Sequence, residues 1–236
     1  MIFKYIFPKD KEISREVFTL ALPVILSNLS RVLMSLIDVA MVGRLGAAAI
    51  AATGMGAMLF WGALSVVMGI RTSVQTVASR RLGQKKHNEC STAFHNGLFM
   101  ATVYSFPVSM LGWAFSHKFV PFFIDDYIAT PLASEYSSII FLILLFSANS
   151  FVFQGFFTAI EKTKIHLTVT VTSNIINVYF NAGLIYGSEG LNRFFQDMAP
   201  GFSFLIHLWD WTHFPALGVK GAAISTLIAS AWLVAH

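Results

Sequence analysis

The chain has 236 residues, of which 56% are hydrophobic and only 12% are charged, and its mean hydropathy is +0.66. A typical soluble domain is about 25% charged, so this composition excludes an ordinary soluble protein and predicts a membrane protein. The net charge of +4 and the pI near 9.3 would also suit a nucleic-acid-binding protein. However, the basic residues gather in loops between apolar segments, which favours a membrane protein.

Six segments are long and apolar enough to cross a bilayer as helices. A helix needs roughly 20 residues to cross a hydrocarbon core of about 30 Å, whereas a transmembrane strand needs only about 9–11. The sequence therefore predicts an all-α membrane protein with six transmembrane helices forming one lobe. The segments lie near residues 17–42, 50–79, 92–116, 132–160, 165–187 and 216–236.

The basic residues between these segments predict how the chain is oriented. Cytoplasmic loops carry an excess of Lys and Arg, and the basic residues here cluster in alternate loops. We therefore expect a cytoplasmic N-terminus in the inner (cytoplasmic) membrane and, after six spans, a cytoplasmic C-terminus. The clustered residues are Lys4, Lys9, Lys11 and Arg15, then Arg80, Arg81, Lys85 and Lys86, then Lys162 and Lys164.

One loop is long and aromatic. It covers about residues 188–215 and is rich in Phe and Trp. This stretch is too apolar for a solvated loop and too interrupted to span the membrane. Because Trp and Tyr prefer the headgroup level, we expect an interfacial or re-entrant helix on the outer side. It would be an insertion within a single transmembrane domain of residues 1–236.

Asp38 is an acidic residue inside the first apolar segment. An ionised carboxylate in hydrocarbon costs at least about 2.5–3.5 kcal/mol, so its side chain should face the bundle interior or a water-filled cavity. There it could exchange protons or bind Na⁺, which makes Asp38 a candidate coupling site. The alternative is that Asp38 only neutralises Arg31 or Arg71. Arg31 lies about 10 Å away along the helix axis, so contact between that pair cannot be assumed.

The fifth segment carries a polar stripe in which Ser173, Asn174, Asn177 and Asn181 recur at helical spacings of three and four. Amide oxygens suit a hard cation. The same side chains could instead form interhelical hydrogen bonds, worth about 0.6–2 kcal/mol per contact. Both interpretations stay open at this point. In the first segment, Pro23 removes one helical hydrogen bond and predicts a kink below Asp38.

Nothing in the sequence is typical of an enzyme or of a cofactor site. No nucleophile and base arrangement or metal-ligand cluster stands out. The single cysteine, Cys90, offers neither an intrachain disulfide nor a thiolate metal cluster. We therefore expect no catalytic residue, no resident metal and no cofactor other than a coupling ion, H⁺ or Na⁺.

Four stretches of the chain resemble the multidrug and toxic compound extrusion (MATE) transporters. The resemblance implies a twelve-span exporter built of two six-helix lobes, of which this chain is similar to the first. It also implies alternating access, with efflux of drugs or other organic compounds driven by inward flow of H⁺ or Na⁺. In the family's order, the stretches are LALPVILSNLSRVLMSLIDVAMVGRLGAAAIAATG, SVQTVASRRLGQKK, SNIINVYFNAGLIYG and FPALGVKGAAISTLIAS.

The resemblance further implies a cation pocket. Asp38 matches the family's first-span Asp, Asn177 matches the span-five Asn, and Thr226 matches the span-six Thr. Asn181 occupies the position where the family pattern usually has a second acid, so we expect coupling to rest on Asp38 alone. Pro23 would act as a hinge. Residues that could give polar support are Arg31, Arg71 and Asn174.

The chain has about half the spans of a full transporter of this kind. Transporter sites usually lie at the interface of two repeats, so an isolated lobe should not complete an alternating-access path. The expected partners are the lipid bilayer, a small organic substrate and a second six-helix lobe from another chain or a second copy, with no nucleic acid. Two other functions stay open. One is a lipid-linked saccharide flippase of a related superfamily, with a more cationic cavity, and the other is a non-transporting membrane subunit or half-gene fragment.

Overall fold

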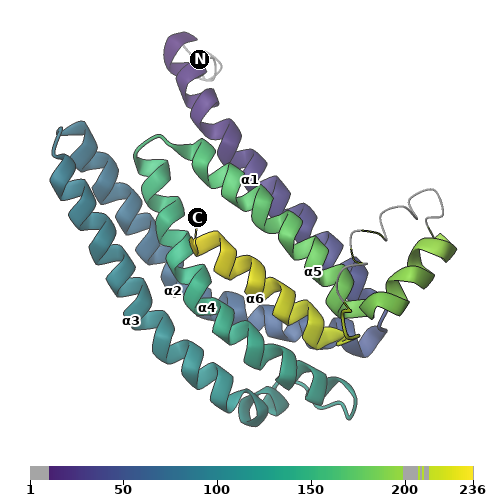
Figure 1. The fold of residues 1–236 in the computed structure, drawn as a ribbon. Helices are drawn as coiled ribbons and strands as arrows, with labels where there is room; N and C mark the ends of the chain where they lie inside the picture. The colour runs from purple at the N-terminus through teal and green to yellow at the C-terminus, as the bar shows by residue number, and fades with distance from the viewer. Residues whose placement is uncertain (1–10, 199–206, 208, 210–212, 236) are drawn as a thin grey trace, which may run out of the picture.

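The computed structural model describes residues 11–198, 207, 209 and 213–235, and in this part of the chain the regular structure is helical. Each of the six predicted segments falls on one α-helix (Figure 1), which confirms the all-α fold. In chain order the elements are α1 (Lys11–Gly43), α2 (Ala47–Gly83), α3 (His87–Phe119), the short 3₁₀ helix η2 (Val120–Phe122), α4 (Ala129–Ala159), α5 (Thr163–Met198) and α6 (Val219–Ala235).

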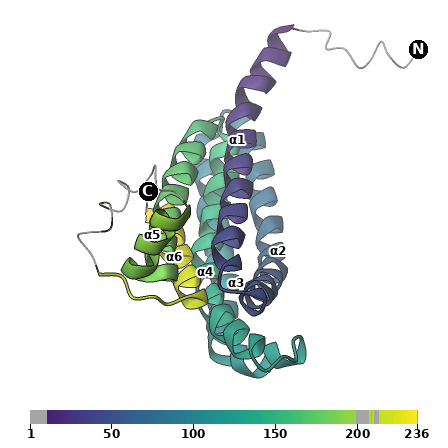
Figure 2. The ribbon, with the colours of Figure 1, turned by 90° about the vertical axis from the view of Figure 1, so that its right-hand side faces the viewer.

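The helices form two layers. In one layer α2, α3 and α4 pack on one another, and in the other α1 lies along α5. Helix α6 packs on both α5 and α4 and so joins the layers, whereas α1 touches α2 at few positions. The N-terminal part of α1 projects beyond the other helices (Figure 2). The space between the layers is therefore bounded by α1, α2, α4, α5 and α6.

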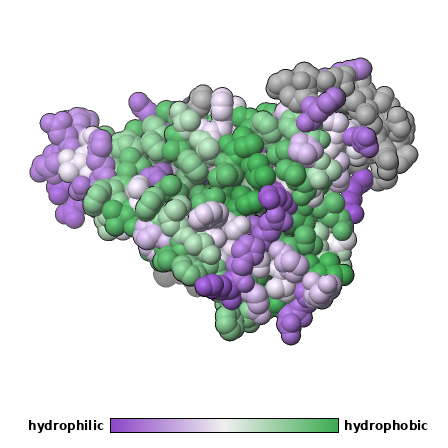
Figure 3. All heavy atoms as spheres, turned by 60° about the horizontal axis from the view of Figure 1, so that its bottom comes forward, coloured by the Kyte–Doolittle hydropathy of each residue, from purple (hydrophilic) through white to green (hydrophobic). Residues whose placement is uncertain are grey.

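The surface of the bundle is apolar. By length and composition, α1, α2, α3 with η2, and α4 are each able to cross a membrane. Helix α5 has 36 residues with an inward-facing polar stripe, and the apolar α6 has 17. Large hydrophobic side chains such as Leu36 and Phe99 are more than half exposed. Hydrophobic residues cover most of the face seen in Figure 3, as expected where lipid replaces water.

Small residues let the helices approach closely. A side chain at Gly221 on α6 would overlap the carbonyl group of Leu184 on α5, and a side chain at Gly155 on α4 would overlap the backbone of Arg71 on α2. Glycine at such positions permits tight packing of helices in lipid. The main apolar core lies between α2, α3 and α4 and consists of Leu64, Val67, Val74, Ala101, Leu144, Ala148, Phe151 and Val152.

Helix α5 breaks at Gly187, where φ is 70° and ψ is 171°, and then continues to Met198. A positive φ favours glycine because a β-carbon would be strained there. Beyond the break, the Trp209 ring stacks on Tyr179 with 5.0 Å between centroids, and its Nε1 donates to the Tyr179 carbonyl oxygen at 3.0 Å. Residues 199–206, 208 and 210–212 of the aromatic insertion lie outside the described residues. The interfacial helix there stays a prediction.

Candidate cation and substrate site

Side chains from α1, α5 and α6 form one hydrogen-bond network around Asp38. The Asn181 amide nitrogen Nδ2 donates to Asp38 Oδ1 and, at 2.8 Å, to Asn177 Oδ1. Asn177 Nδ2 in turn donates to Thr226 Oγ1 at 3.3 Å. Because residues four apart lie on one helical face, both amides point into the seam between α5, α1 and α6. The structure thus brings together the four residues that the sequence assigned to the cation pocket.

Ser225 completes this network, although the sequence analysis did not identify it. Its hydroxyl group donates to Asn181 Oδ1 and lies 2.9 Å from the Ala222 carbonyl oxygen. The Asn181 amide therefore uses its oxygen for Ser225 and its nitrogen for Asp38 and Asn177. This orients the amide as a donor to the carboxylate. The one signal in the sequence was a hydroxyl residue next to Thr226.

Neither Arg31 nor Arg71 neutralises Asp38. Within the part of the chain that the structure describes, Asp38 makes no ion pair. The two guanidinium groups instead lie over the ring of Phe151 on α4, with their central carbons 5.2 and 5.7 Å from its centroid. The interpretation of Asp38 as a fixed counterion of an arginine is therefore wrong for this structure.

Two cavities meet at Asp38. One has a volume of about 250 Å³ and is lined by α1, α2, α4 and α6. The other has a volume of about 270 Å³, extends along α1 to Arg31 and includes residues of α5. Ser35, Asp38 and Thr226 line both cavities, so the carboxylate lies in the wall that they share. An ion or a ligand at this shared wall would be next to Asp38.

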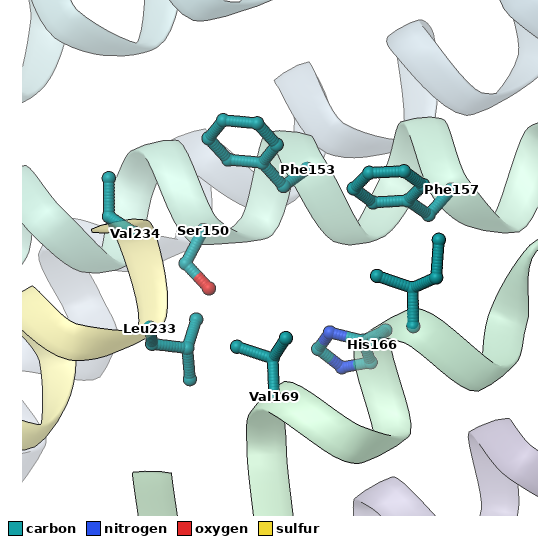
Figure 4. Close-up of a pocket in the computed structure, with 8 residues that line it drawn as sticks. Ser150, Phe153, Phe157, His166, Val169, Leu233 and Val234 are labelled. Atoms are coloured by element: carbon teal, nitrogen blue, oxygen red, sulfur yellow. The ribbon is translucent and has the colours of Figure 1, made fainter. Parts of the chain in front are cut away.

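A smaller cavity of about 80 Å³ continues the series between α4, α5 and α6. Ser150 and Leu233 line both this cavity and the 270 Å³ cavity. Figure 4 shows Ser150 on α4 and His166 on α5 facing the same space. The buried His166 has its Nε2 3.3 Å from Thr170 Oγ1. Adjoining cavities therefore extend between the two layers from Asp38 past Arg31 to His166.

The chemistry of the Asp38 network suits a small cation. Asp38, Asn177 and Thr226 present carboxylate, amide and hydroxyl oxygens, the ligand types that hard cations such as Na⁺ take. A carboxylate in contact with a cavity can also exchange a proton with water that enters there. The network therefore has the groups to bind either Na⁺ or H⁺, with one formal negative charge to hold it.

The other two residues assigned from the sequence lie outside this network. Asn174 Nδ2 donates to Ser30 Oγ at 2.7 Å and so ties α5 to α1 about two turns from Asp38. Pro23 is buried inside α1, which runs as one helix through it, and its carbonyl oxygen accepts a hydrogen bond from Ser27 Oγ at 2.8 Å. The hinge at Pro23 stays a prediction.

The fold and its surface define a helical membrane protein with cavities inside the bundle. The sequence model described as MatE matches residues 23–182, more than half of the chain. The chain therefore belongs to the MatE family.

Individual relatives agree with this assignment. The chain is 27% identical over 187 residues to the probable multidrug resistance protein NorM of Geobacillus kaustophilus, covering 76% of this chain and 39% of the relative. It is 25% identical over 217 residues to the multidrug resistance protein NorM of Burkholderia vietnamiensis, covering 92% of this chain and 42% of the relative. The chain thus spans about two fifths of the length of these relatives.

Solved structures share the fold. An outward-facing multidrug resistance MATE family transporter of the MOP superfamily superposes with a TM-score of 0.76 at 17% identity, covering 93% of this chain and 43% of that chain. A MOP superfamily transporter from Pyrococcus furiosus, described as having a binding pocket of reverse polarity, superposes with a TM-score of 0.75 at 17% identity, covering the same shares.

Proposed function

We propose that this chain is the N-terminal lobe of a cation-coupled antiporter that exports drugs or other organic compounds across the cytoplasmic membrane. The observation that carries the proposal is the position of Asp38 in the shared wall of two cavities. Its carboxylate accepts a hydrogen bond from an amide and, among the described residues, forms no ion pair. The names of the NorM relatives support export of organic compounds.

In the proposed mechanism, Asp38 alternates between two states. When it is ionised, the Asn181 amide donates to it and holds α1 against α5. When H⁺ or Na⁺ arrives, the negative charge is neutralised, and the charge-assisted hydrogen bond to Asn181 weakens. A ligand can shift a conformational equilibrium only through a difference in affinity between the states. Loss of this bond supplies that difference at the α1–α5 seam, and Pro23 would let α1 bend.

The rest of the transport path is also part of the proposal. A substrate would occupy the cavities between the layers, and a second six-helix lobe, from another chain or from a second copy, would close them on the other side. The clustered basic residues favour an N-terminus and a C-terminus in the cytoplasm. In that orientation the aromatic insertion would lie on the outer side of the membrane.

The test is dye efflux from proteoliposomes under an imposed pH or Na⁺ gradient. Asp38→Asn keeps the size and polarity of the side chain but removes its charge, so we expect cation-driven efflux to fall to background. The matched control is Glu135→Gln, because Glu135 is half exposed and pairs with Lys220 at 2.8 Å on the surface. Full efflux by Asp38→Asn would contradict the proposal.

A second candidate is a lipid-linked saccharide flippase of a related superfamily. It is favoured by the two arginines that meet over Phe151, because a cationic cavity suits an anionic lipid headgroup. The same proteoliposomes separate the candidates, since a flippase would move a lipid-linked saccharide and leave the dye inside. A wild-type chain that moves neither compound, alone or together with a second six-helix lobe, would favour a non-transporting membrane subunit.

A further inference from the structure

Two cationic side chains from different helices converge inside the bundle. Arg31 on α1 and Arg71 on α2, here called the arginine pair, both lie against the ring of Phe151 on α4, with their central guanidinium carbons 5.2 and 5.7 Å from its centroid. The buried His166 of α5 lines the adjoining 80 Å³ cavity, which shares Ser150 and Leu233 with the cavity that Arg31 lines. Three helices thus contribute positively charged or titratable groups to the same region.

Both arginines are partly buried, and they lack the partners that guanidinium groups inside a helical bundle normally have. Each guanidinium has five N–H donors, and within the described residues neither arginine donates a hydrogen bond or makes an ion pair. The Phe151 ring attracts each cation, but it does not cancel the repulsion between them. Charges inside a membrane protein normally pair with an opposite charge or face a water-filled cavity. Arg31 lines the 270 Å³ cavity, and Arg71 adjoins it through Phe151, whose ring also lines the cavity.

We propose that the arginine pair binds an oxyanion, a phosphate group carried by a lipid or by a soluble compound that enters the 270 Å³ cavity. Planar guanidinium groups match phosphate oxygens with paired N–H donors, and a phosphate has enough oxygens to bridge two arginines. The idea that the bound compound is also transported rests on the proposed function. The binding of phosphate at the arginine pair does not depend on that function.

The other residues around the cavity fit an anion at this end. The hydroxyl groups of Ser147, Ser150 and Ser230 line the same cavity and can donate to phosphate oxygens. Among the described residues that line it, Asp38 is the one acid. It lies about 10 Å from Arg31 along α1 and accepts its hydrogen bond from Asn181. An anion at the arginine pair would therefore be separated from the carboxylate by about two helical turns.

The experiment uses the purified full chain and follows its thermal unfolding midpoint during titration with inorganic phosphate, against chloride at equal ionic strength. A ligand that binds the folded state raises this midpoint as its concentration exceeds Kd. Losing a hydrogen-bonded charge partner weakens binding by about 10- to 100-fold. We therefore expect Arg31→Gln and Arg71→Gln each to lose the phosphate-induced rise. Arg80→Gln removes the same charge from an exposed position and should keep it.

A second arm tests lipid as the source of the phosphate. The chain is released from nanodiscs that contain phosphatidylglycerol and phosphatidylcholine, and the lipids that it retains are identified by native mass spectrometry. Retention of phosphatidylglycerol by the wild type, reduced at least tenfold in both glutamine variants but not in Arg80→Gln, assigns the phosphate to a lipid. A rise with inorganic phosphate alone assigns it to a soluble compound.

The lysine variants keep the test valid if a glutamine variant fails to fold. Arg31→Lys and Arg71→Lys preserve the charge and lose the planar pair of donors, so we expect weaker phosphate binding by a folded chain. Equal responses of wild type, arginine variants and Arg80→Gln in both arms would overturn the inference. Asp38→Asn should keep the phosphate response. The two proposals can therefore fail separately. A result against ion coupling at Asp38 does not contradict phosphate binding at the arginine pair, and a result against phosphate binding does not contradict ion coupling.

Discussion

The two ends of the 270 Å³ cavity differ in how their charges are held. At one end the Asp38 carboxylate accepts a hydrogen bond from an amide that is itself fixed by Ser225 and Asn177. At the other end Arg31 lines the cavity and shares the ring of Phe151 with Arg71, and within the described residues neither arginine has an acceptor. The negative charge is built into a network, whereas the positive charges are left to be satisfied by something else.

This difference shows what each end can do. The Asp38 carboxylate is held by a neutral amide. A cation can therefore replace this hydrogen bond without depriving another charged group of its partner. Two cations without a hydrogen-bond acceptor destabilise the folded chain, and an anionic ligand would remove this destabilisation when it binds. The Asp38 end is therefore suited to an ion that comes and goes, and the arginine end to a group that brings its own negative charge.

The largest expected effect comes from breaking the network itself. Asn181→Leu removes the donor to Asp38 and to Asn177, whereas the Ser225 hydroxyl can still donate to the Ala222 carbonyl oxygen. Each buried polar group left without a partner costs about 1–3 kcal/mol, so we expect the free energy of unfolding to fall by about 3 kcal/mol. Denaturant titration in micelles measures it. Asn149→Leu, which breaks the Thr102–Asn149 bond, is the control and should cost less. Equal losses of unfolding free energy in the two variants would mean that the Asp38 network stabilises the fold no more than a single side-chain hydrogen bond.

A smaller effect tests how the arginine end is assembled. Gly155→Ala places a methyl group against the backbone of Arg71 and should push α2 away from α4. Overpacking of this kind costs about 1–3 kcal/mol. We expect the unfolding free energy to fall by about 2 kcal/mol and phosphate binding to weaken. Gly69→Ala on α2 meets open space and should be neutral or slightly stabilising, because alanine favours helix. A neutral Gly155→Ala would contradict this packing.

The smallest effect separates the aromatic contact from general packing. Phe151 and Phe141 are equally buried on α4, but only Phe151 lies under the arginine pair. Changing each phenylalanine to leucine removes similar volume, and Phe141→Leu also removes an edge contact with Phe119, so the difference between the two variants is a lower bound on the cation–ring interactions. We expect Phe151→Leu to cost about 1 kcal/mol more than Phe141→Leu in unfolding experiments without added anion. A smaller cost for Phe151→Leu would mean that the ring does not stabilise the cations.

The helices could be predicted from the sequence because their signal is local. Six apolar segments gave the positions of α1 to α6, and the three- and four-residue spacing of the span-five asparagines placed them on one face. The meeting of that face with Asp38 is a contact between α1 and α5, which hydropathy does not encode. It was expected only through resemblance to a known family.

Other features of the site could not be predicted from the residues. Whether Arg31 and Arg71 lie beside Asp38 or beside Phe151 depends on how α1, α2 and α4 pack, and the close approach of α2 to α4 requires the glycine at position 155. Ser225 gave no signal in the sequence beyond being a hydroxyl residue next to Thr226. The hinge at Pro23 and the interfacial or re-entrant helix in the aromatic insertion stay predictions, because the first concerns motion and the second concerns residues that lie largely outside those described.

The most direct test of the central claim is to observe Asp38 changing its protonation or ion-bound state. Infrared difference spectroscopy of the purified chain, on raising the pH or adding Na⁺, follows the carboxylic-acid C=O and carboxylate bands. We predict a carboxyl signal that is present in the wild type and in Glu135→Gln and absent in Asp38→Asn. A wild-type spectrum identical to that of Asp38→Asn under both pH and Na⁺ steps would contradict ion coupling at Asp38.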